Sequence, residues 1–389
     1  ASGLKAAEIE FAESVPEDTV YGSTLASRPA SLWSDMIAGA GKTLDIEEFY
    51  IANAPGEALE PVLAALKAAA ARGVKVRVLV ESAMMKETGR TLPELKREPN
   101  VETRVISFRK VAGGVQHAKF FIVDGREVFV GSQNFDWRSL TQIHETGARI
   151  ASERAARAFG AVFEADWAMA AGEDPEKALS AGTGAALNAG KPEKAYVRGE
   201  PVLFSLAFSP ERAIPPGFDS ELKGLLKLIK GAKRTIRAQV MTYSLAGLKK
   251  GSRWAKLDKA LRAAGRRGVK VELMFADWAM GGRADEDIKS LALAANVSVK
   301  LSSIPQAERG FVPYSRVDHC KYLTADGERA MLSTSNWAAD YFFESRGAAL
   351  VLEGAAGAAP LEDIFRRSWN GPYAAPVEQD RDYAPVRRT

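Results

Sequence analysis

The chain has 389 residues, 46% of them hydrophobic, and a formal net charge of +4, a composition typical of a globular protein and not of a disordered or fibrous one. A single cysteine excludes a disulfide framework and a zinc site built from several thiolates, and no run of about 18 apolar residues predicts a membrane span. The first residue is Ala1, a start that fits a mature chain exported to the periplasm or medium after signal-peptide removal, as well as a trimmed chain.

The first part of the chain alternates between helix-like and strand-like patterns. Residues 57–71 form an amphipathic run that Gly73 ends, and the β-branched residues 74–80 follow as a strand. A long helix is expected at residues 153–170, with Ser152 as its N-cap. Further strands are expected at residues 101–108, 115–123 and 127–132.

The same order of elements returns in the second part. A helix is expected at residues 252–265, a strand at 269–275 and a closing helix at 360–369. Further strands are expected at residues 297–302, 317–325 and 329–333. Strands that alternate with helices predict an α/β layered fold in each part.

A sequence repeat shows how the two parts are related. The motif Arg-Gly-Val-Lys-Val stands at residues 72–76 and again at 267–271, which is half a chain length later. We therefore expect an internal duplication with a first lobe at residues 1–175 and a second at 201–389. Residues 176–200 lack hydrophobic periodicity and are expected to be the linker.

The charge is unevenly distributed along the chain. Residues 222–270 contain fifteen basic residues and one acidic residue, Asp258. A polyanionic partner and a solvated helical face both explain such a stretch, and the sequence leaves the choice open.

A short pattern, His-x-Lys-x4-Asp, occurs once in each part. Because side chains alternate faces along a strand, the His and Lys of each copy point to one side and can hold one ligand together. Each Asp lies an odd number of residues after its His and precedes a Gly, so it is expected to shape a hairpin turn. The two copies comprise His117, Lys119 and Asp124, and His319, Lys321 and Asp326.

Polar residues follow each hairpin. Ser132 and Asn134 come after the first hairpin, and Thr334 and Asn336 come after the second. Each Asn lies seventeen residues beyond the His of its motif. Hydroxyl and amide donors repeated in this way suit an oxyanion, so the four residues are candidates for binding a phosphate.

A glutamate follows each motif at a greater distance. Glu145 lies twenty-eight residues after His117, and Glu344 lies twenty-five residues after His319. An imidazole whose second nitrogen donates to a carboxylate is held in one tautomer and becomes more basic. We expect the two glutamates to serve the two histidines in this way.

Several residues near the motifs are expected to be structural. His144 has no counterpart in the second part and is expected at the surface. Cys320 is expected to be a small buried hydrophobe, because strand alternation turns it away from its neighbours His319 and Lys321. Five aromatic residues could stack bases or line an acyl groove, but most of them are expected to fill the core: Phe135, Trp137, Trp337, Tyr341 and Phe342.

The doubled motif with its following Asn resembles the phospholipase D superfamily. Residues 134–142, 313–319 and 334–337 are similar to a narrower branch, the lysosomal phospholipase-D-like 5′ exonucleases and their poxviral envelope relatives. The resemblance extends from about Ile9 to Trp369 and implies two similar lobes, each a β-sheet flanked by helices, related by a pseudo-twofold axis. Ser333 departs from the pattern, because the superfamily usually has Gly there.

The resemblance implies a phosphodiesterase that needs no metal or other cofactor. One His attacks phosphorus and forms a phosphohistidine, the other protonates the leaving oxygen, and water or an alcohol then resolves the intermediate. The Lys and Asn of each copy would bind the non-bridging oxygens. The symmetric motifs leave open which His attacks; we favour His117.

Three functions agree with these residues. The first is a 5′ exonuclease that hydrolyses single-stranded DNA or RNA, and the second is a phospholipase D or transphosphatidylase that acts on phospholipid head groups with the same catalytic residues. The third is a silent binding protein, against which the intact motifs in both parts count. The sequence does not distinguish a monomer from a dimer.

Overall fold

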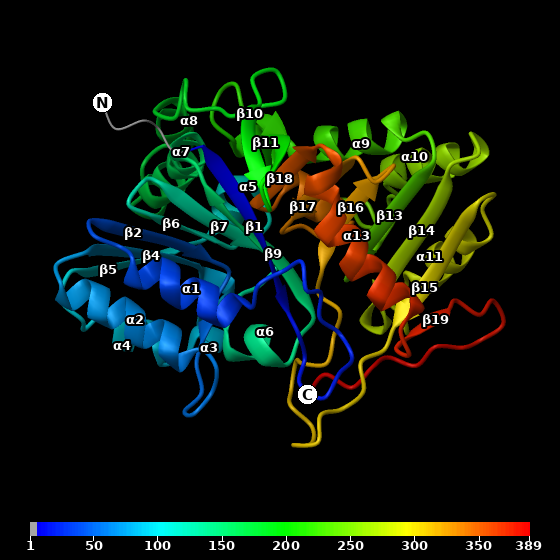
Figure 1. Cartoon of the computed structure of the whole chain (residues 1–389), viewed down its shortest axis with the longest axis horizontal. Helices are drawn as coiled ribbons and strands as arrows, with labels where there is room; N and C mark the ends of the chain where they lie inside the picture. Colours follow the sequence, from blue (N-terminus) through cyan, green and yellow to red (C-terminus); the bar gives the residue numbers. More distant parts are fainter. Residues whose placement is uncertain (1–5) are drawn as a thin grey trace.

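A computed structural model describes residues 6–389 (Figure 1). The first half of the chain builds a sheet in which three parallel strands lie beside four antiparallel ones. The parallel strands are β2 (Thr43–Glu48), β4 (Lys75–Glu81) and β5 (Val101–Ile106). The antiparallel strands are β6 (Phe120–Val123), β7 (Glu127–Gly131), β9 (Glu145–Ala151) and β1 (Ala7–Ser14).

The second half repeats this strand order. The parallel strands are β13 (Thr235–Val240), β14 (Lys270–Ala276) and β15 (Val297–Ser302). The antiparallel strands are β16 (Lys321–Ala325), β17 (Arg329–Ser333), β18 (Gly347–Glu353) and β11 (Glu200–Ser209). Two short strands extend the large sheet: β12 (Asp219–Ser220) pairs with β11, and β19 (Ala374–Pro376) pairs with β15. The strands β3 (Ile51–Ala52) and β8 (Phe135–Asp136) form a separate two-stranded sheet.

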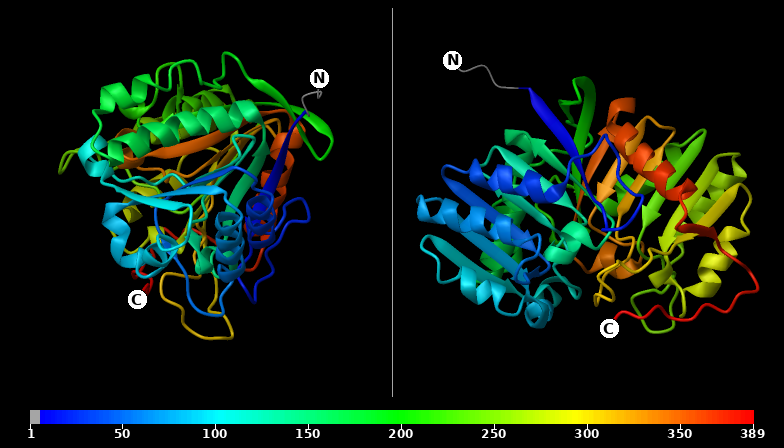
Figure 2. Two further views of the ribbon diagram at one scale, coloured as in Figure 1. Left: turned by 90° about the vertical axis from the view of Figure 1, so that its left-hand side faces the viewer. Right: turned by 60° about the horizontal axis from the view of Figure 1, so that its bottom comes forward.

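Helices cover both faces of the strands in each half (Figure 2). The longer ones are α1 (Pro29–Ala38), α2 (Glu60–Ala71) and α7 (Glu153–Ala170), and then α9 (Glu221–Gly231), α10 (Lys256–Arg266) and α13 (Ala355–Asn370). The shorter ones are α3 (Met85–Thr88), α4 (Thr91–Leu95), α5 (Phe108–Ala112), α6 (Trp137–Thr141), α8 (Pro175–Ser180), α11 (Asp285–Ala292) and α12 (Ala339–Phe343).

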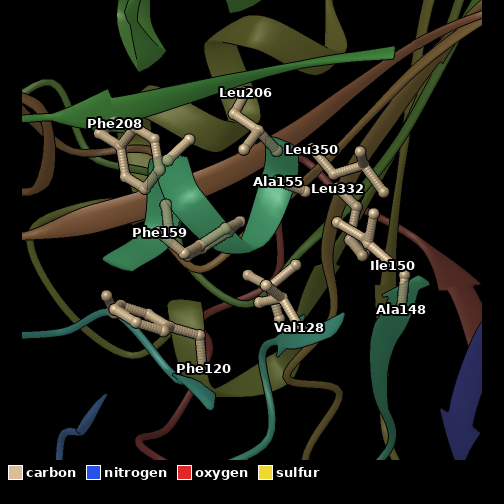
Figure 3. Packing of buried hydrophobic residues seen from close by; sticks show 14 of the residues in the cluster. Phe120, Val128, Ala148, Ile150, Ala155, Phe159, Leu206, Phe208, Leu332 and Leu350 are labelled. Carbon is tan, nitrogen blue, oxygen red and sulfur yellow. The ribbon is translucent and has the colours of Figure 1, made fainter. Parts of the chain in front are cut away.

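Strand alternation decides which helix each side chain meets. Phe120 of β6 belongs to the same buried cluster as Phe159 of α7, whereas the next residue, Phe121, belongs to the cluster that contains α1 and α2. The α7 cluster continues into the second half through residues such as Leu332 and Leu350, as Figure 3 shows. The two halves therefore share one hydrophobic core.

The prediction of an α/β fold with two similar sheets flanked by helices is confirmed. Several elements also match closely: α7 has its expected bounds, and Ser152 caps it by accepting a hydrogen bond from the N–H of Ala155 at 3.1 Å. Several strands were not predicted from the sequence, among them β1, β9, β11, β18 and β10 (Glu193–Val197). β10 falls within the expected linker, and it pairs with both β1 and β11 because its apolar side chains are buried.

The strands expected to carry the motif histidines are shorter than predicted. β6 and β16 begin after His117 and His319, so both histidines lie in the extended segments that precede these strands. Single bridges tie the segments to the opposite half, one from Gln116 to Arg346 and one from Asp318 to His144. The segments do not join their own sheets because they pair across the molecule.

The motif aspartates lie at the opposite end of these strands. Asp124 has a φ of +52°, and its carboxylate accepts hydrogen bonds from the backbone N–H groups of Gly41, Lys42 and Thr43 at 2.9, 2.7 and 2.9 Å. These bonds lower the pKa of Asp124. Asp326 forms the same turn in the second half. Both carboxylates therefore connect a hairpin turn to the start of a neighbouring strand.

We expect Asp124→Asn to destabilise the protein by roughly 1–2 kcal/mol, because the three N–H groups lose an ionised acceptor. The folded variant should keep the wild-type kcat, since the turn is remote from His117. Thermal unfolding and steady-state kinetics measure the two effects separately. An inactive Asp124→Asn protein of unchanged stability would contradict the structural role.

Candidate active site

The segments that carry the two motif histidines meet between the halves. The backbone N–H of His117 donates to the carbonyl oxygen of Arg346 at 3.0 Å, and that of His319 donates to the carbonyl oxygen of His144 at 2.8 Å. Arg346 belongs to the second half and His144 to the first. Each motif histidine is therefore held by the half that does not contain it.

Both motif lysines lie in this site. Lys119 and Lys321 are each 1% exposed, and their ammonium groups donate to the carbonyl oxygens of His117 and His319 at 2.6 and 2.7 Å. Burial lowers the pKa of Lys321 to about 7 and that of Lys119 well below its usual value. A bound phosphodiester would place negative charge beside both lysines and favour their ammonium forms.

The imidazole of His319 has a carboxylate partner. Its Nδ1 lies 2.5 Å from Oε1 of Glu145, which β9 of the other half supplies. Burial raises the pKa of Glu145 to about 8, and burial and the two lysine charges lower the pKa of His319. This bond holds the ring in one orientation and leaves Nε2 as the nitrogen available to a substrate.

The imidazole of His117 has a different partner. Its Nδ1 lies 3.0 Å from the carbonyl oxygen of Thr334, which can only accept, so Nδ1 carries the proton and Nε2 has a free lone pair. Burial and the charges of the nearby lysines lower the pKa of His117 well below its usual value. The rings of Phe49 and Tyr341 lie 4.9 and 5.0 Å from the imidazole.

The expected pairing of Glu344 with His117 does not occur. The carboxylate of Glu344 lies against Gly113, because a Cβ placed on Gly113 would be 3.2 Å from Oε1 of Glu344. In the register of the sheets, the counterpart of Glu145 is Gly347, which also lies twenty-eight residues after its motif histidine. The sequence analysis matched the two glutamates although their spacings differ by three residues.

Another carboxylate occupies the space beside Gly347. A Cβ on Gly347 would come within 2.5 Å of Oε2 of Glu221, which also accepts a hydrogen bond from Ser335 Oγ at 2.8 Å. The other oxygen of Glu221 accepts from Ser333 Oγ. Ser333, the residue that departs from the family pattern, is thus accommodated by a buried glutamate that the sequence analysis did not single out.

The candidate phosphate-binding residues separate into two groups. The hydroxyls of Ser132 and Thr334 accept hydrogen bonds from the backbone N–H groups of Thr146 and Ala348 at 3.1 and 3.0 Å. These hydroxyls therefore support β9 and β18, and their binding of a phosphate stays a prediction. Asn134 and Asn336 are 5% and 3% exposed, and within residues 6–389 their Oδ1 atoms have no hydrogen-bond partner.

The surface position expected for His144 is wrong, because its side chain is fully buried. Its Nε2 lies 3.0 Å from Oε1 of Glu13, and its ring stacks on Tyr21 with a centroid distance of 4.1 Å. Both partners lie more than 120 residues earlier in the sequence, so no local pattern revealed them. Cys320 is buried, and burial raises its pKa to about 12.

One group of potential metal ligands stands out among residues 6–389. Donor atoms of His144, Asp318 and Cys320 lie within 4.8 Å of one another, and Asp318 and Cys320 flank His319 in the sequence. Hydrogen bonds already use these atoms: the side-chain amide of Gln239 donates to Asp318 at 2.5 Å and lies 3.3 Å from Nδ1 of His144. The group thus forms a hydrogen-bonded network behind the site.

The basic residues at positions 222–270 fall into two groups, those that form ion pairs and those that do not. Six of its side chains form ion pairs with acidic residues and are largely neutralised: Lys223, Arg234, Arg237, Arg253, Arg262 and Lys270. Several exposed lysines form no ion pair within the part of the chain that the structure describes: Lys227, Lys230, Lys233, Lys249, Lys250, Lys256 and Lys259.

Most of the aromatic candidates lie in the core, as expected. Phe135, Trp337 and Phe342 are buried, whereas Trp137 and Tyr341 are half-buried near the site. None of the helices within residues 6–389 is long and apolar enough to cross a membrane. Export of the chain stays a prediction.

Two α/β halves, each with one His-Lys motif, define the class of this protein: an internally duplicated chain with one site between its halves. Residues 34–167 and 225–369 match the family described as "Cardiolipin synthase, PLD-like domain". The chain therefore belongs to the phospholipase-D-like domain family.

Two relatives illustrate this membership. The chain is 33% identical to the 5'-3' exonuclease PLD3 of Rattus norvegicus over 407 residues, which covers 96% of this chain and 82% of the relative. It is 31% identical to the virion nicking-joining enzyme of Vaccinia virus (strain Western Reserve) over 389 residues, which covers 95% of this chain and 88% of the relative.

Solved structures agree on the fold. Phosphatidylserine synthase of Haemophilus influenzae Rd KW20 superimposes with a TM-score of 0.61 at 12% identity, covering 89% of this chain and 85% of that one. The predicted membership of the phospholipase D superfamily is confirmed, and so is the predicted class of a hydrolase of phosphodiester bonds.

We expect Glu145→Gln to lower kcat by roughly 10²–10⁴-fold, because His319 loses an ionisable partner that fixes its tautomer. Glu344→Gln serves as the matched control and should keep the wild-type kcat, because Glu344 lies against Gly113 and is the partner of neither motif histidine. Single-turnover rates at saturating substrate measure both. Equal losses in the two variants would contradict the assignment.

Glu145 should also make stability depend on pH. Its pKa is 4.5 in an ordinary environment and about 8 in the folded protein, so folding takes up a proton between these values. Its contribution to stability therefore falls as the pH rises from 4.5 to about 8. Because Gln cannot ionise, the Tm of Glu145→Gln minus that of the wild type should increase across this range in thermal scans. A constant difference would contradict the raised pKa.

Proposed function

We propose that the chain is a 5′ exonuclease that hydrolyses single-stranded nucleic acid through a phosphohistidine. The observation that carries this proposal is the unequal pair of imidazoles beside two buried lysines. His117 keeps Nε2 free and unprotonated, whereas His319 shares a proton with Glu145. A nucleophile and an acid in one anion-binding site support double displacement at phosphorus.

The first displacement uses both histidines. Nε2 of His117 attacks phosphorus while the bond from phosphorus to the oxygen of the leaving strand breaks. That oxygen takes the proton from Nε2 of His319, and the proton of Glu145 moves to Nδ1 of the same ring. The products of this step are a phosphohistidine on His117 and a free hydroxyl on the leaving strand.

The second displacement reverses the roles. Water attacks the phosphohistidine, and His117 leaves with its electron pair. His319 accepts a proton from this water at Nε2 and returns its Nδ1 proton to Glu145. Lys119 and Lys321 would stabilise the non-bridging oxygens in both steps, and the amides of Asn134 and Asn336 would donate hydrogen bonds to them. None of these steps requires a metal ion.

The choice of nucleic acid rests on the relatives and on the rings beside the site. The printed names of the rat and vaccinia relatives describe an exonuclease and a nicking-joining enzyme. Phe49 and Tyr341, whose rings both lie near that of His117, are half-buried and can stack on a base. A phospholipase D or transphosphatidylase would use the same catalytic groups and is the alternative to test.

A side-by-side assay tests the proposal. A 5′-hydroxyl single-stranded oligonucleotide and phosphatidylcholine vesicles are incubated with the protein, each with and without EDTA. We expect stepwise shortening of the oligonucleotide, unchanged by EDTA, and no release of choline. Choline release without shortening would show the phospholipase, and loss of activity in EDTA that Mg²⁺ or Zn²⁺ restores would overturn the mechanism.

Replacing either motif histidine should abolish turnover without unfolding the protein. We expect His117→Ala and His319→Ala each to reduce kcat to the limit of detection, because the two imidazoles supply different groups to one reaction. The His319→Ala protein keeps the nucleophile but lacks the acid, so it should form a covalent phospho-adduct on an acid-quench gel only from a p-nitrophenyl phosphodiester, whose leaving group needs no proton. Near-wild-type turnover of either variant would show that the two motifs do not share one site.

A further inference from the structure

The site lies at one end of each sheet, and the connecting loops at that end decide how a substrate can reach it. β13 ends at Val240, and its antiparallel neighbour β16 begins at Lys321, so the loops before and after these residues surround the site. The loops on the two sides are not alike. One side is covered by a long segment, and the other carries exposed cationic groups.

The covering segment is the strap, residues 303–318, which is the yellow-to-orange loop at the lower edge of Figure 1. It leaves the second half and crosses onto the first. Arg309 of the strap forms an ion pair with Glu57 and lies 5.5 Å from the ring centroid of Trp137. The carbonyl oxygen of Pro313 accepts a hydrogen bond from Arg138 at 3.2 Å. The strap therefore closes over residues that directly follow Asn134.

The equivalent loop of the second half is basic. The basic loop, residues 246–253, follows β13 and leads to α10. Lys249 and Lys250 are exposed in this loop and form no ion pair within residues 6–389. The corresponding first-half loop, residues 53–59, carries Glu57, which pairs with the strap.

Helix α12 connects the basic loop with the active site. Tyr341 at its centre lies beside His117, and Phe343 at its end is 37% exposed. The half-buried ring of Trp254, just after the basic loop, lies 5.8 Å from that of Phe343. Exposed aromatic rings next to lysines are the combination with which proteins bind single-stranded nucleic acids.

We propose that the strand beyond the scissile phosphate leaves the site over α12 and the basic loop, with its phosphates on Lys249 and Lys250 and its bases on Phe343 and Trp254. The strap closes the other side, so only the terminal nucleotide fits there. A binding groove that is closed by the strap and open toward the basic loop would admit a strand only by its end, which explains cleavage from a strand terminus. This inference rests on the proposed nuclease function and adds the direction in which the strand runs.

The test compares two pairs of exposed lysines from the same basic stretch. Lys249→Ala/Lys250→Ala removes the proposed contacts. Lys230→Ala/Lys233→Ala is the control, because Lys233 borders the Asp326 turn at the opposite end of β16. Each variant is assayed on a 20-nucleotide single strand and on a dinucleotide, whose one phosphate occupies the scissile position.

We expect the Lys249→Ala/Lys250→Ala variant to bind the long strand more weakly and to cleave the dinucleotide like the wild type. If each lysine contacts one phosphate, the slope of log K against log salt concentration should fall by about 1.4 in magnitude. The control should retain the wild-type slope.

Three results would overturn the inference while the nuclease function stands: equal behaviour of the two variants on the long strand, an equal loss on the dinucleotide, or a loss confined to binding of anionic vesicles. The last would identify the basic loop as a lipid-binding surface. A wild-type protein that leaves every oligonucleotide intact would instead refute the nuclease function itself.

Discussion

The site depends on one reciprocal arrangement, in which the backbone of each half holds the motif histidine of the other. The N–H of His117 and that of His319 donate to carbonyl oxygens across the molecule. The carboxylate of Glu145 crosses in the same way to reach His319. The catalytic groups therefore assemble only when the halves are docked, which the hydrophobic core shared between them ensures.

Duplication supplied two equivalent scaffolds, and later differences in buried charge made the two histidines unequal. At equivalent positions behind the site stand Arg346, which forms a fully buried bidentate pair with Asp166, and His144, which contacts Glu13 and Asp318. Of the two motif histidines, only His319 has a glutamate partner within residues 6–389. A backbone carbonyl can only accept a hydrogen bond, whereas a carboxyl group can take up a proton and give it back. This difference suits His117 to attack and His319 to protonate.

Sequence alone predicted the parts of this protein that repeat or that follow a local period. The motif pairs, the hairpin aspartates and α7 all have short-range signals. Three features were not predicted because the residues that form them are distant in the sequence. His144 is buried against Glu13, the carboxylate of Glu221 lies beside Gly347, and β10 pairs with both β1 and β11. The pairing of Glu344 with His117 failed because Glu344 lies twenty-five residues after its motif histidine, whereas the counterpart of Glu145 at the equal spacing of twenty-eight is Gly347.

The electrostatics of the site connect its stability with its function. Lys119 and Lys321 are buried without full counter-charge, and burial also disfavours ionised Glu145, so all three groups oppose folding near neutral pH. A phosphodiester anion between the lysines supplies the missing charge and raises the pKa of His319 toward the range in which it can donate a proton. Substrate binding should therefore stabilise the docked halves and prepare the acid through the same interaction, since a ligand that binds only the folded state shifts the folding equilibrium toward it.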